Sequence, residues 1–472
     1  MKSLHTLVAQ YTSTPVVRVE QLAQSGSHRI YTRIFLADGT TLMGAYNDDV
    51  KENEAFFTFT RFFSKENIHV PQLLAVSNDR MTYLLSDLGD ETLFTYLARR
   101  KKACDGQLPD DVVDYFKQAL KVLPQLQLCG RKDFDFSVCY PSEAFDRQSM
   151  QWDLNYFKYF FLKLVYIPFD EQKLEADFQT LINYLAEVES DFFMFRDFQS
   201  RNIMIQNDQV HFIDYQGGRR GALQYDVASL LFQARAGLSA QLREDLLEYY
   251  LDELQKHIAV DRADFKRHYY GFVLIRALQV LGAYGYRGYF EKKSHFLLSI
   301  PPAVENLRYL IDNEKIAMNV PHLVEVMRSI TERNWAPVES ADGKLTVVVS
   351  SFSYKKGIPA DESSNGGGFV FDCRALPNPG REPQYKHSTG RDRDVIEYLE
   401  KYPEVADFKQ HLFAIVDMSV DNYLERHFTH LCVNCGCTGG QHRSVYFAQS
   451  IADHLRAQYP DVNVVLHHRE QE

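Results

Sequence analysis

The sequence has 472 residues, of which 45% are hydrophobic and 24% are charged, and its formal net charge is −11. This length predicts two or three folding units, and the composition excludes a disordered or fibrous protein. Because the chain has no overall positive field, nucleic acid is not the expected partner. The seven cysteines have no framework spacing and no signal-peptide pattern opens the sequence, so we expect a cytoplasmic protein with reduced thiols. The longest apolar stretch is too short to span a bilayer, which predicts no membrane role.

A strand-rich segment with one helix opens the chain. Residues Arg29 to Leu36 and Thr41 to Tyr46 flank an Asp-Gly turn and predict a hairpin. Glu52 to Phe63 has helical apolar spacing, and Met81 to Ser86 reads as a buried strand. We therefore expect a mixed small lobe over about residues 1–92.

Helical periodicity dominates the next segment, for which we expect a large lobe over about residues 93–332. The predicted helices are Val112 to Leu128, Leu154 to Val165, Leu174 to Val188 and Gln241 to Lys256. Two short apolar runs, Ile203 to Ile205 and Val210 to Ile213, interrupt them. The pair Asn207-Asp208 separates these runs, which predicts a hairpin embedded among helices.

A stretch with proline, aspartate and glycine at residues 333–344 predicts a linker to a second domain over 345–472. Strands and helices alternate in that domain, which favours an α/β fold. The predicted strands are Thr346 to Ser350, Phe369 to Cys373, His430 to Cys435 and Val462 to His467, and the predicted helices are Val395 to Lys401, Val420 to Arg426 and Ser444 to Tyr459.

Three polar residues converge on the embedded hairpin. Asp197 precedes it, Asn202 follows five residues later, and Asp214 ends its second strand. Phosphoryl transfer needs a carboxylate that orients the attacking hydroxyl and oxygen ligands that hold magnesium against the nucleotide phosphates. The common alternative is that such residues only cap turns, but the spacing and the hairpin favour a catalytic site.

Three motifs around this hairpin resemble the aminoglycoside phosphotransferase/choline kinase family over roughly residues 1–330. The motifs are Arg196-Asp197 with Asn202, Ile213-Asp214-Tyr215-Gln216, and Gln224 to Leu231. The resemblance implies an α+β protein-kinase-like, two-lobed domain, followed here by the smaller α/β domain. With Leu85-Ser86-Asp87-Leu88-Gly89-Asp90 included, the sequence is most similar to anomeric N-acetylmuramate/N-acetylglucosamine kinases, which phosphorylate the anomeric hydroxyl of the sugar.

This resemblance also implies residue roles and cofactors. Asp197 would be the catalytic base, and Asn202 and Asp214 would hold Mg²⁺. The turn of Ser25, Gly26, Ser27 and His28 would cover the phosphates of ATP, and Asp226 would support the catalytic loop. Arg196 and Asp153 are expected to contact the substrate, although Asp153 also fits the solvated face of an amphipathic helix.

The sequence departs from the family at two positions. Phe195 stands where a histidine is usual, and the strand Thr41 to Tyr46 has no lysine for the nucleotide phosphates. The nucleotide must therefore be held by magnesium, by backbone donors or by a displaced Lys51 or Arg33, or the domain is a binding-only pseudokinase.

A second motif, Cys435 to Ser444, is rich in glycine and lies between a predicted strand and a predicted helix. Small residues allow close approach of a ligand, the helix start binds anions, and Arg443 suits a phosphate ester. Cys437 and Arg443 also have the Cys-x5-Arg spacing of thiolate phosphatases, but no general-acid loop is evident. Zinc binding by the neighbouring cysteines is not favoured, because no second ligand pair is present.

This loop, Ser350 to Pro359 and Phe371 to Pro379 together resemble the carboxy-terminal domain of the RNase adapter protein RapZ over about residues 345–470. In that family the domain senses glucosamine-6-phosphate and contacts RNA. The resemblance implies a sugar-phosphate pocket formed by Asp372, Arg374, Cys437, Thr438, Gly439, Gly440, His442 and Arg443. The tail lacks the family's lysine-rich end, so RNA binding is not expected here.

The sequence therefore predicts an ATP- and Mg²⁺-dependent kinase of a small-molecule amino sugar, with a carboxy-terminal domain that binds a sugar phosphate. The alternative is a regulatory pseudokinase and sugar-phosphate sensor that acts through RNA or protein partners. The acceptor hydroxyl and the oligomeric state stay open.

Overall fold

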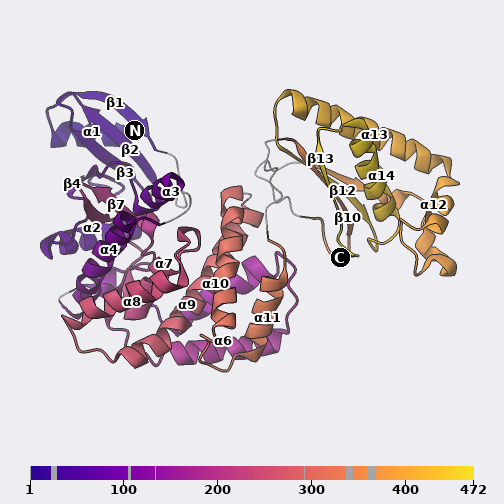
Figure 1. Cartoon of the computed structure of the whole chain (residues 1–472). Helices are drawn as coiled ribbons and strands as arrows, with labels where there is room; N and C mark the ends of the chain where they lie inside the picture. Colours follow the sequence, from indigo (N-terminus) through magenta and orange to yellow (C-terminus); the bar gives the residue numbers. More distant parts are fainter. Residues whose placement is uncertain are drawn as a thin grey trace. The chain divides into compact units, whose positions relative to one another are not determined.

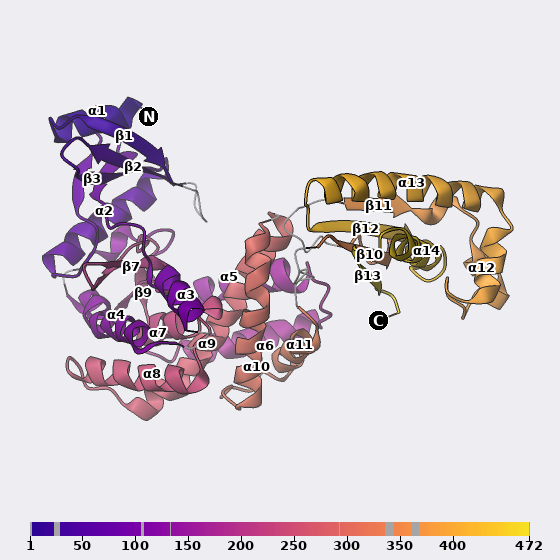
Figure 2. The same cartoon turned by 45° about the horizontal axis from the view of Figure 1, so that its top comes forward.

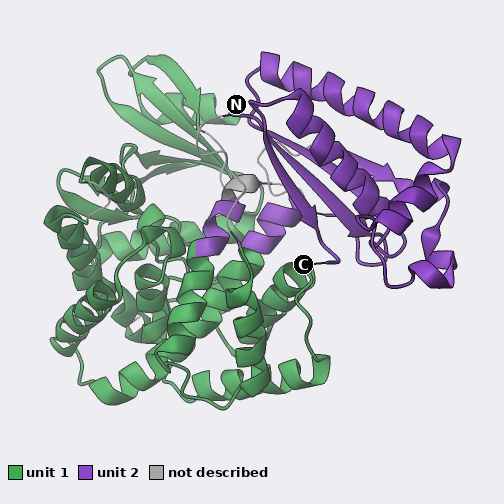
Figure 3. Ribbon diagram, turned by 45° about the vertical axis from the view of Figure 1, so that its right-hand side comes forward, with its two compact units in different colours: residues 1–283, 302–334 green, residues 284–301, 335–472 purple. Residues whose placement is uncertain are grey.

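The computed structural model describes residues 2–22, 29–104, 108–132, 134–291, 293–335, 344–359 and 368–471. The chain divides into two compact units, drawn in green and purple in Figure 3. Unit 1 contains Met1–Ala283 and Pro302–Asn334, and unit 2 contains Tyr284–Pro301 and Trp335–Glu472. Each unit has a hydrophobic core of its own.

Unit 1 opens with a small lobe built on a five-stranded antiparallel sheet in the order β1-β2-β3-β5-β4 (Figure 1). The strands are β1 (Val16–Gln21), β2 (Ile30–Leu36), β3 (Thr41–Tyr46), β4 (Leu73–Val76) and β5 (Thr82–Ser86). Helix α1 (Lys2–Tyr11) covers part of the sheet, where Leu7 and Val8 pack against Ile34, Leu42 and Leu84. The predicted hairpin of the first strands is confirmed.

Helix α2 (Val50–Lys65) follows β3 and connects the small lobe to the catalytic region. It begins at Asp49, whose side chain accepts a hydrogen bond from the backbone N–H of Glu52. Its apolar face is fully buried and includes Phe56, Phe59 and Phe63. This burial fixes the orientation of the helix, so the polar residues of its first turn have a defined direction.

The large lobe of unit 1 is mainly helical (Figures 1 and 2). Its helices are α3 (Leu93–Ala103), α4 (Asp110–Leu128), α5 (Arg147–Phe157), α6 (Glu171–Leu185), α7 (Leu223–Leu231), α8 (Ala240–Gln255), α9 (Arg262–Gly285), α10 (Ile300–Asp312) and α11 (Pro321–Glu332). Two short antiparallel pairs lie among them, β6 (Phe192–Met194) with β9 (Arg219–Gly221) and β7 (Ile203–Gln206) with β8 (Gln209–Phe212).

The embedded hairpin is confirmed, and its turn explains why these residues form it. Asn207 and Asp208 have φ values of 52° and 58°, and both lie in the left-handed region. A two-residue turn of this hand matches the twist of the strands, and asparagine and aspartate tolerate it better than most residues. The turn thereby fixes the register of β7 against β8.

Unit 2 contains a four-stranded parallel sheet in the order β11-β12-β10-β13. The strands are β10 (Thr346–Ser353), β11 (Gly368–Asp372), β12 (His430–Cys437) and β13 (Asn463–His468), and the helices are α12 (Arg393–Glu400), α13 (Pro403–Glu425) and α14 (Arg443–Gln458). Helix α14 packs on β10, β12 and β13, and the apolar face of α13 joins the same core. The predicted helix at 420–426 is therefore only the end of a much longer one.

The predicted fold class is confirmed by these elements: an antiparallel small-lobe sheet and a helical lobe, followed by a smaller parallel α/β domain. Among the helices that the structure describes, none combines the length and apolar character needed to cross a membrane.

Candidate active site

The loop predicted to be catalytic, called the catalytic loop below, runs from the end of β6 into the β7–β8 hairpin and contains two residues with unusual backbone geometry. Arg196 and Asp214 have φ values of 77° and 68°. Non-glycine residues in this region are uncommon, and the strain persists only where surrounding contacts impose it. Here such contacts are present, and they bring the predicted catalytic residues together.

Asp226, in the first turn of α7, holds the start of the loop. Its carboxylate accepts hydrogen bonds from the backbone N–H groups of Phe195, at 2.8 Å, and Arg196, at 3.0 Å. The residue is fully buried, and burial raises its pKa to about 7 even though both N–H groups oppose that rise. Asp226 therefore lies in the protein interior and holds the loop in place through these two hydrogen bonds.

Asp197 is the open carboxylate of the loop, with 43% of its side chain exposed. Its Oδ1 accepts a hydrogen bond from Nη2 of Arg276, on α9, at 2.7 Å. Burial raises the pKa of this carboxyl, but the charges of Arg276, Arg201 and Arg196 outweigh burial and lower it to about 2. Asp197 is therefore ionised at neutral pH and can accept a hydrogen bond from a hydroxyl.

Asn202 directly precedes β7 and Asp214 follows β8, so both lie at the open end of the hairpin. Asp197 is close to both of them. The amide of Asn202 donates to the carbonyl of Asp197 at 2.9 Å, and Gln216 donates to Oδ1 of Asp214 at 2.8 Å. Burial, and then the negative charge of Asp197, raise the pKa of Asp214. Two carboxylates that repel each other across a small space, with an amide oxygen nearby, are a donor set that fits a hard divalent cation.

Arg276 was missed by the sequence analysis, because it lies in the middle of a helix with no motif around it. If it lowers the pKa of Asp197, replacing it by glutamine should move the acid limb of the kcat/KM profile towards higher pH. Burial would then raise the pKa of the Asp197 carboxyl with less positive charge nearby to lower it. Arg276→Lys retains the charge and should keep the limb near its original position.

The matching stability effect has a defined sign. Because the pKa of Asp197 is lower in the folded chain, its ion pair stabilises the fold above the unfolded pKa, and that contribution is lost as the pH falls towards 2. Acid unfolding of Arg276→Gln should therefore lack this component. An unchanged kcat/KM profile in Arg276→Gln would contradict the assigned role.

Arg196 and Asp153, the predicted substrate contacts, bind each other. Nη2 of Arg196 lies 2.6 Å from Oδ1 of Asp153, on α5, and Nη1 donates to the hydroxyl of Tyr225 at 2.6 Å. Asp153 is 8% exposed, so it does not lie on the solvated face of its helix. Its Oδ2 is buried without a hydrogen-bond partner in the described part of the chain. The pair thus lies beside the catalytic loop and retains one unsatisfied acceptor.

In the small lobe, Arg29 lies directly before β2 and forms an ion pair with Glu52 of α2 at 3.1 Å. Its guanidinium also lies 5.7 Å from the centre of the Phe56 ring. That ring stacks on Tyr215, with centroids 5.2 Å apart and an interplanar angle of 7°. Because Tyr215 follows Asp214, these contacts bring the guanidinium to the side of the site where the metal ligands are predicted. The charge of Arg29 accordingly opposes the rise in the pKa of Asp214.

The two cations considered from the sequence are placed differently. Arg33 donates to the carboxylates of Asp87 and Asp90 and to the carbonyl of Gly89, and Lys51 is exposed on α2. Arg33 thus stabilises the Leu-Gly-Asp turn. The predicted phosphate cover, Ser25 to His28, lies outside the described residues.

The glycine-rich segment of unit 2 links the end of β12 to the start of α14. The thiol of Cys437 lies 3.1 Å from the hydroxyl of Ser444, and Cys437 is 3% exposed. Burial raises the thiol pKa, but hydrogen bonds from Ser444 and Gly440 and the charge of Arg443 outweigh burial and lower it below the ordinary value. Thr438 and Gly439 are exposed, so the open part of the loop is its glycine-containing edge.

The other predicted pocket residues stabilise the walls of the loop. Nη1 of Arg443 donates to the carbonyls of Arg374 and Leu376 at 2.9 and 2.8 Å. Nε2 of His442 lies 2.8 Å from the carbonyl of Tyr385. Arg374 forms an ion pair with Asp372 at 2.6 Å, and about half of each side chain is exposed. Of this group, Asp372 and Arg374 therefore present charge at the surface, whereas Arg443 holds the turn that carries them.

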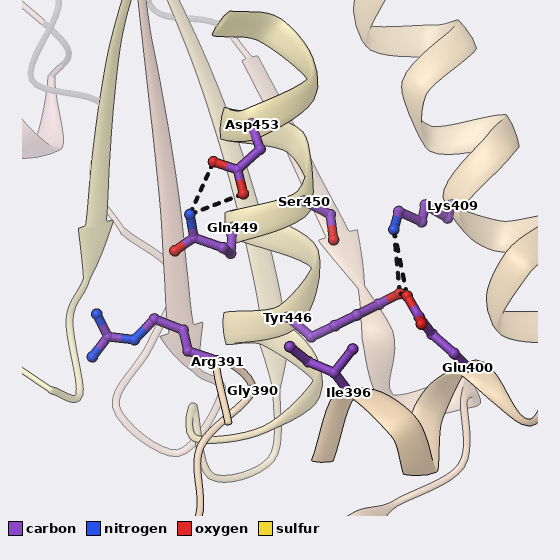
Figure 4. Close-up of a pocket in the computed structure, with 9 residues that line it drawn as sticks. All are labelled: Gly390, Arg391, Ile396, Glu400, Lys409, Tyr446, Gln449, Ser450 and Asp453. Atoms are coloured by element: carbon purple, nitrogen blue, oxygen red, sulfur yellow. Dashed lines mark hydrogen bonds and ion pairs between the residues drawn. The ribbon is translucent and has the colours of Figure 1, made fainter. Parts of the chain in front are cut away.

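A cavity of 370 Å³ lies on another side of α14 (Figure 4). Figure 4 shows Glu400, Lys409 and Tyr446 meeting at one wall, where the Tyr446 hydroxyl donates to Glu400 at 2.9 Å. Gln449 donates to Asp453 at the opposite wall. Most polar side chains of these two walls therefore bind one another. Among the described residues, no three His, Cys, Asp or Glu side chains form a metal-binding cluster.

Comparisons with known proteins match two separate parts of the chain to two different families. The model of the phosphotransferase enzyme family matches residues 20–262, and the model of the RapZ C-terminal domain matches residues 345–472. Both family resemblances predicted from the motifs are thereby confirmed.

Among curated relatives, a nucleotide-binding protein of Psychrobacter sp. (strain PRwf-1) is 34% identical over 183 residues, which are 37% of this chain and 54% of that protein. A nucleotide-binding protein of Thermotoga neapolitana is 36% identical over 182 residues, which are 39% of this chain and 58% of that protein. The chain thus spans little more than half the length of these relatives.

Among solved structures, an ethanolamine kinase of Plasmodium vivax has a TM-score of 0.45 at 13% identity and covers 63% of this chain and 84% of its own. Choline kinase from Cryptosporidium parvum Iowa II has a TM-score of 0.45 at 13% identity, with coverages of 64% and 91%. The family model alone extends over more than half of the 472 residues. The chain therefore belongs to the phosphotransferase enzyme family and also carries a domain of the RapZ C-terminal type.

Proposed function

We propose that the chain transfers the γ-phosphoryl group of ATP to a hydroxyl of an amino sugar. The observation that carries this proposal is the convergence of Asp197, Asn202 and Asp214 on one hairpin, where the charge of Asp197 acts on Asp214. Asp197 accepts the hydrogen bond of the acceptor hydroxyl and orients its oxygen for in-line attack. Asn202 and Asp214 would hold the divalent cation, Mg²⁺, which neutralises charge on the phosphates.

Arg29 supplies the cation that the β3 strand lacks. It is held by Glu52 and by the ring of Phe56, and its charge reaches Asp214. A guanidinium in that position can bind the oxygens of two neighbouring phosphates through separate nitrogens. Glu52 fixes the direction of the side chain, so less conformational entropy is lost when the nucleotide binds. This arrangement favours an active kinase over the pseudokinase alternative.

We propose the anomeric hydroxyl of N-acetylmuramate or N-acetylglucosamine as the acceptor. Besides the motif resemblance, the electrostatics of Asp197 support this choice. A carboxylate whose pKa is lowered to about 2 is a weak base, and it suits a hydroxyl that is more acidic than an ordinary alcohol. The anomeric hydroxyl of a sugar has that property, because the ring oxygen withdraws electrons from it.

A product analysis tests this function. The purified chain is incubated with Mg²⁺, ATP and each of a set of amino sugars, and the products are separated and their phosphate position is assigned. An anomeric phosphate removes the reducing end of the sugar, whereas a phosphate on any other hydroxyl retains it. The proposal requires loss of the reducing end together with formation of ADP. Absence of any sugar phosphate with the complete set would favour the regulatory alternative.

For unit 2, we propose that the open edge of the loop at Thr438 and Gly439 binds a sugar phosphate such as glucosamine-6-phosphate. The start of α14 offers N–H groups and a positive dipole, and Asp372 pairs with Gly436 at the end of β12, where the chain enters the loop. Gly439 has open space within 4 Å of the position where a Cβ would stand. A side chain there would thus enter the space that a ligand needs.

Gly439→Ala should therefore lower the affinity for glucosamine-6-phosphate at least about tenfold without lowering the melting temperature, because the added methyl group contacts nothing in the fold. Isothermal calorimetry with glucosamine-6-phosphate, glucosamine and inorganic phosphate measures the effect. Gly440→Ala is the contrasting variant, since Gly440 has a φ of 70° and an added Cβ would clash with the side chain of Glu470, which predicts a loss of stability. Equal binding by wild type and Gly439→Ala would refute the site.

A further inference from the structure

Arg219 is a buried cation beside the catalytic loop that phosphoryl transfer, as described above, does not use. It lies in β9, opposite Met194 of β6, three residues before Asp197. The residue is 8% exposed. Its Nε donates to the carbonyl of Gly217 and its Nη1 to the hydroxyl of Ser142, both at 3.1 Å. Both of these partners are neutral.

No carboxylate of the described residues lies within ion-pair distance of Arg219, although its neighbours are paired. Arg196 is paired with Asp153, and Arg276 with Asp197. Burial, and then the positive charge of Arg196, lower the pKa of Arg219. Arg196 and Arg276 thus occupy the two carboxylates, and the charge of Arg219 is buried without an ion-pair partner among the described residues. Burial of an unpaired charge is costly unless an anion joins it.

The remaining nitrogen of Arg219 is available for such an anion. Its Nη2 makes no hydrogen bond within the described part of the chain, and it is not sealed from the surface. The Nε of Arg276 and the Oδ2 of Asp153 are both buried without a hydrogen-bond partner among the described residues. Unsatisfied donors and acceptors on the acceptor side of Asp197 indicate that a polar ligand completes this region.

The elements around Arg219 indicate which substrate it would contact. Residues 142–145 run alongside β9, where the backbone N–H of Arg220 donates to the carbonyl of Glu143, and that of Phe145 donates to the carbonyl of Arg220. The segment leads into α5, which carries Asp153. Arg219 is therefore enclosed between the catalytic loop and the segment that approaches the sugar. A group bound there would belong to the acceptor and not to the nucleotide, because the proposed phosphate site lies towards Asp214 and Arg29.

We propose that the acceptor of this kinase is anionic, and that Arg219 binds its negative group, a carboxylate or a phosphate ester. This inference rests on the proposed function and narrows its substrate class: among amino sugars it selects those with an acidic substituent over their neutral counterparts. Arg219 is then a specificity-determining residue, because it contributes binding energy only to acceptors that carry the charge. The anion in turn compensates the buried guanidinium.

The experiment compares acceptors that differ in charge at nearly constant shape. The set contains N-acetylmuramate, its methyl ester, N-acetylglucosamine and N-acetylglucosamine-6-phosphate. The KM of phosphoryl transfer and, independently, the calorimetric Kd in the presence of Mg²⁺ and ADP are measured for wild type. We expect one anionic sugar to have a KM and a Kd about 10- to 100-fold lower than its neutral counterpart, as hydrogen bonds to charged groups generally contribute. Comparing N-acetylmuramate with its methyl ester tests a carboxylate as the anionic group, and comparing N-acetylglucosamine-6-phosphate with N-acetylglucosamine tests a phosphate ester.

Variants then assign the preference to one residue. Arg219→Gln should raise the KM for the anionic sugar towards that of the neutral one and leave the neutral one nearly unchanged. Arg219→Lys should recover part of the preference. Arg220→Gln is the matched control, because Arg220 is the next residue of β9 but is 44% exposed and is paired with Asp191. It should retain the wild-type preference.

A structural role predicts a different result. If Arg219 only stabilised the fold, Arg219→Gln would lower the melting temperature and affect all acceptors equally. If it is an uncompensated charge, the melting temperature should stay the same or rise. Equal KM and Kd values for charged and neutral sugars would overturn the inference while the proposed kinase function stands. Binding of an anionic sugar through Arg219 without any transfer would support the anion site at Arg219 and refute the proposed function.

Discussion

Asp197→Asn should reduce kcat for phosphoryl transfer by a factor of about 10² to 10⁴, the contribution typical of a positioned general base. The amide keeps the shape of the side chain but cannot receive the proton of the acceptor hydroxyl. Since Asn202 and Asp214 remain, the KM for ATP should change little. Steady-state assays with a coupled ADP readout measure both constants.

The same replacement removes the partner of Arg276, which is buried, so a loss of activity must be separated from a loss of stability. The double variant Asp197→Asn/Arg276→Gln provides this separation, because it removes both members of the ion pair. Its melting temperature should recover, and its kcat should not. Asp208→Asn, at the turn of the same hairpin, is the control and should be fully active. A double variant with wild-type kcat would exclude Asp197 as the base.

Arg29→Gln should raise the KM for ATP by a factor of about 10 to 100, since hydrogen bonds to ionised groups contribute roughly 1.5–3 kcal/mol each. The replacement removes the positive charge that Glu52 holds near the metal side of the site. Arg29→Lys should recover part of the affinity, because a lysine at this position restores the charge without the two-pronged geometry. Nucleotide titrations at fixed Mg²⁺ measure the effect.

Arg80→Gln is the matched control for this prediction. Arg80 forms an ion pair with Glu54, two residues after Glu52 on the same helix, but it lies at the surface. The control should keep the wild-type KM. If both variants behaved alike, the effect would belong to helix α2 in general, and the phosphate cation would have to be sought elsewhere.

The elements with regular apolar patterns could be predicted from the sequence, and the longest helix of unit 2 could not. β3 and the β7–β8 hairpin have strand alternation and clear turn residues, and they lie where expected. Helix α13 has only Val405, Leu412, Val416 and Val420 fully buried along its 23 residues. Since its apolar stripe is narrow and interrupted, a window of a few turns does not show the period, and only the final part was recognised.

For the site, the sequence was informative where the spacing between residues is local. Asp197 lies five residues before Asn202, and Asn202 and Asp214 flank the two strands of one hairpin, so their proximity follows from the local chain and the turn. Arg276 lies 79 residues after Asp197 in the sequence, and Arg29 lies in the small lobe. No local pattern marks either residue. The ion pair between Arg196 and Asp153 also joins distant segments. These partners depend on tertiary packing, which composition and periodicity do not encode individually.

The stack of Phe56 on Tyr215 connects the proposed phosphate-binding cation with the proposed metal ligand, which lie far apart in the sequence. The hydroxyl of Tyr215 also shares a 2.6 Å hydrogen bond with Thr60, so α2 contacts the residue after Asp214 through two side chains. Any rotation of this helix displaces both Glu52, which directs Arg29, and the carboxylate proposed for the metal. If both proposed sites are correct, binding of the cation and binding of the nucleotide would be coupled through α2, and thermodynamic reciprocity would then require each to change the affinity of the other by the same factor.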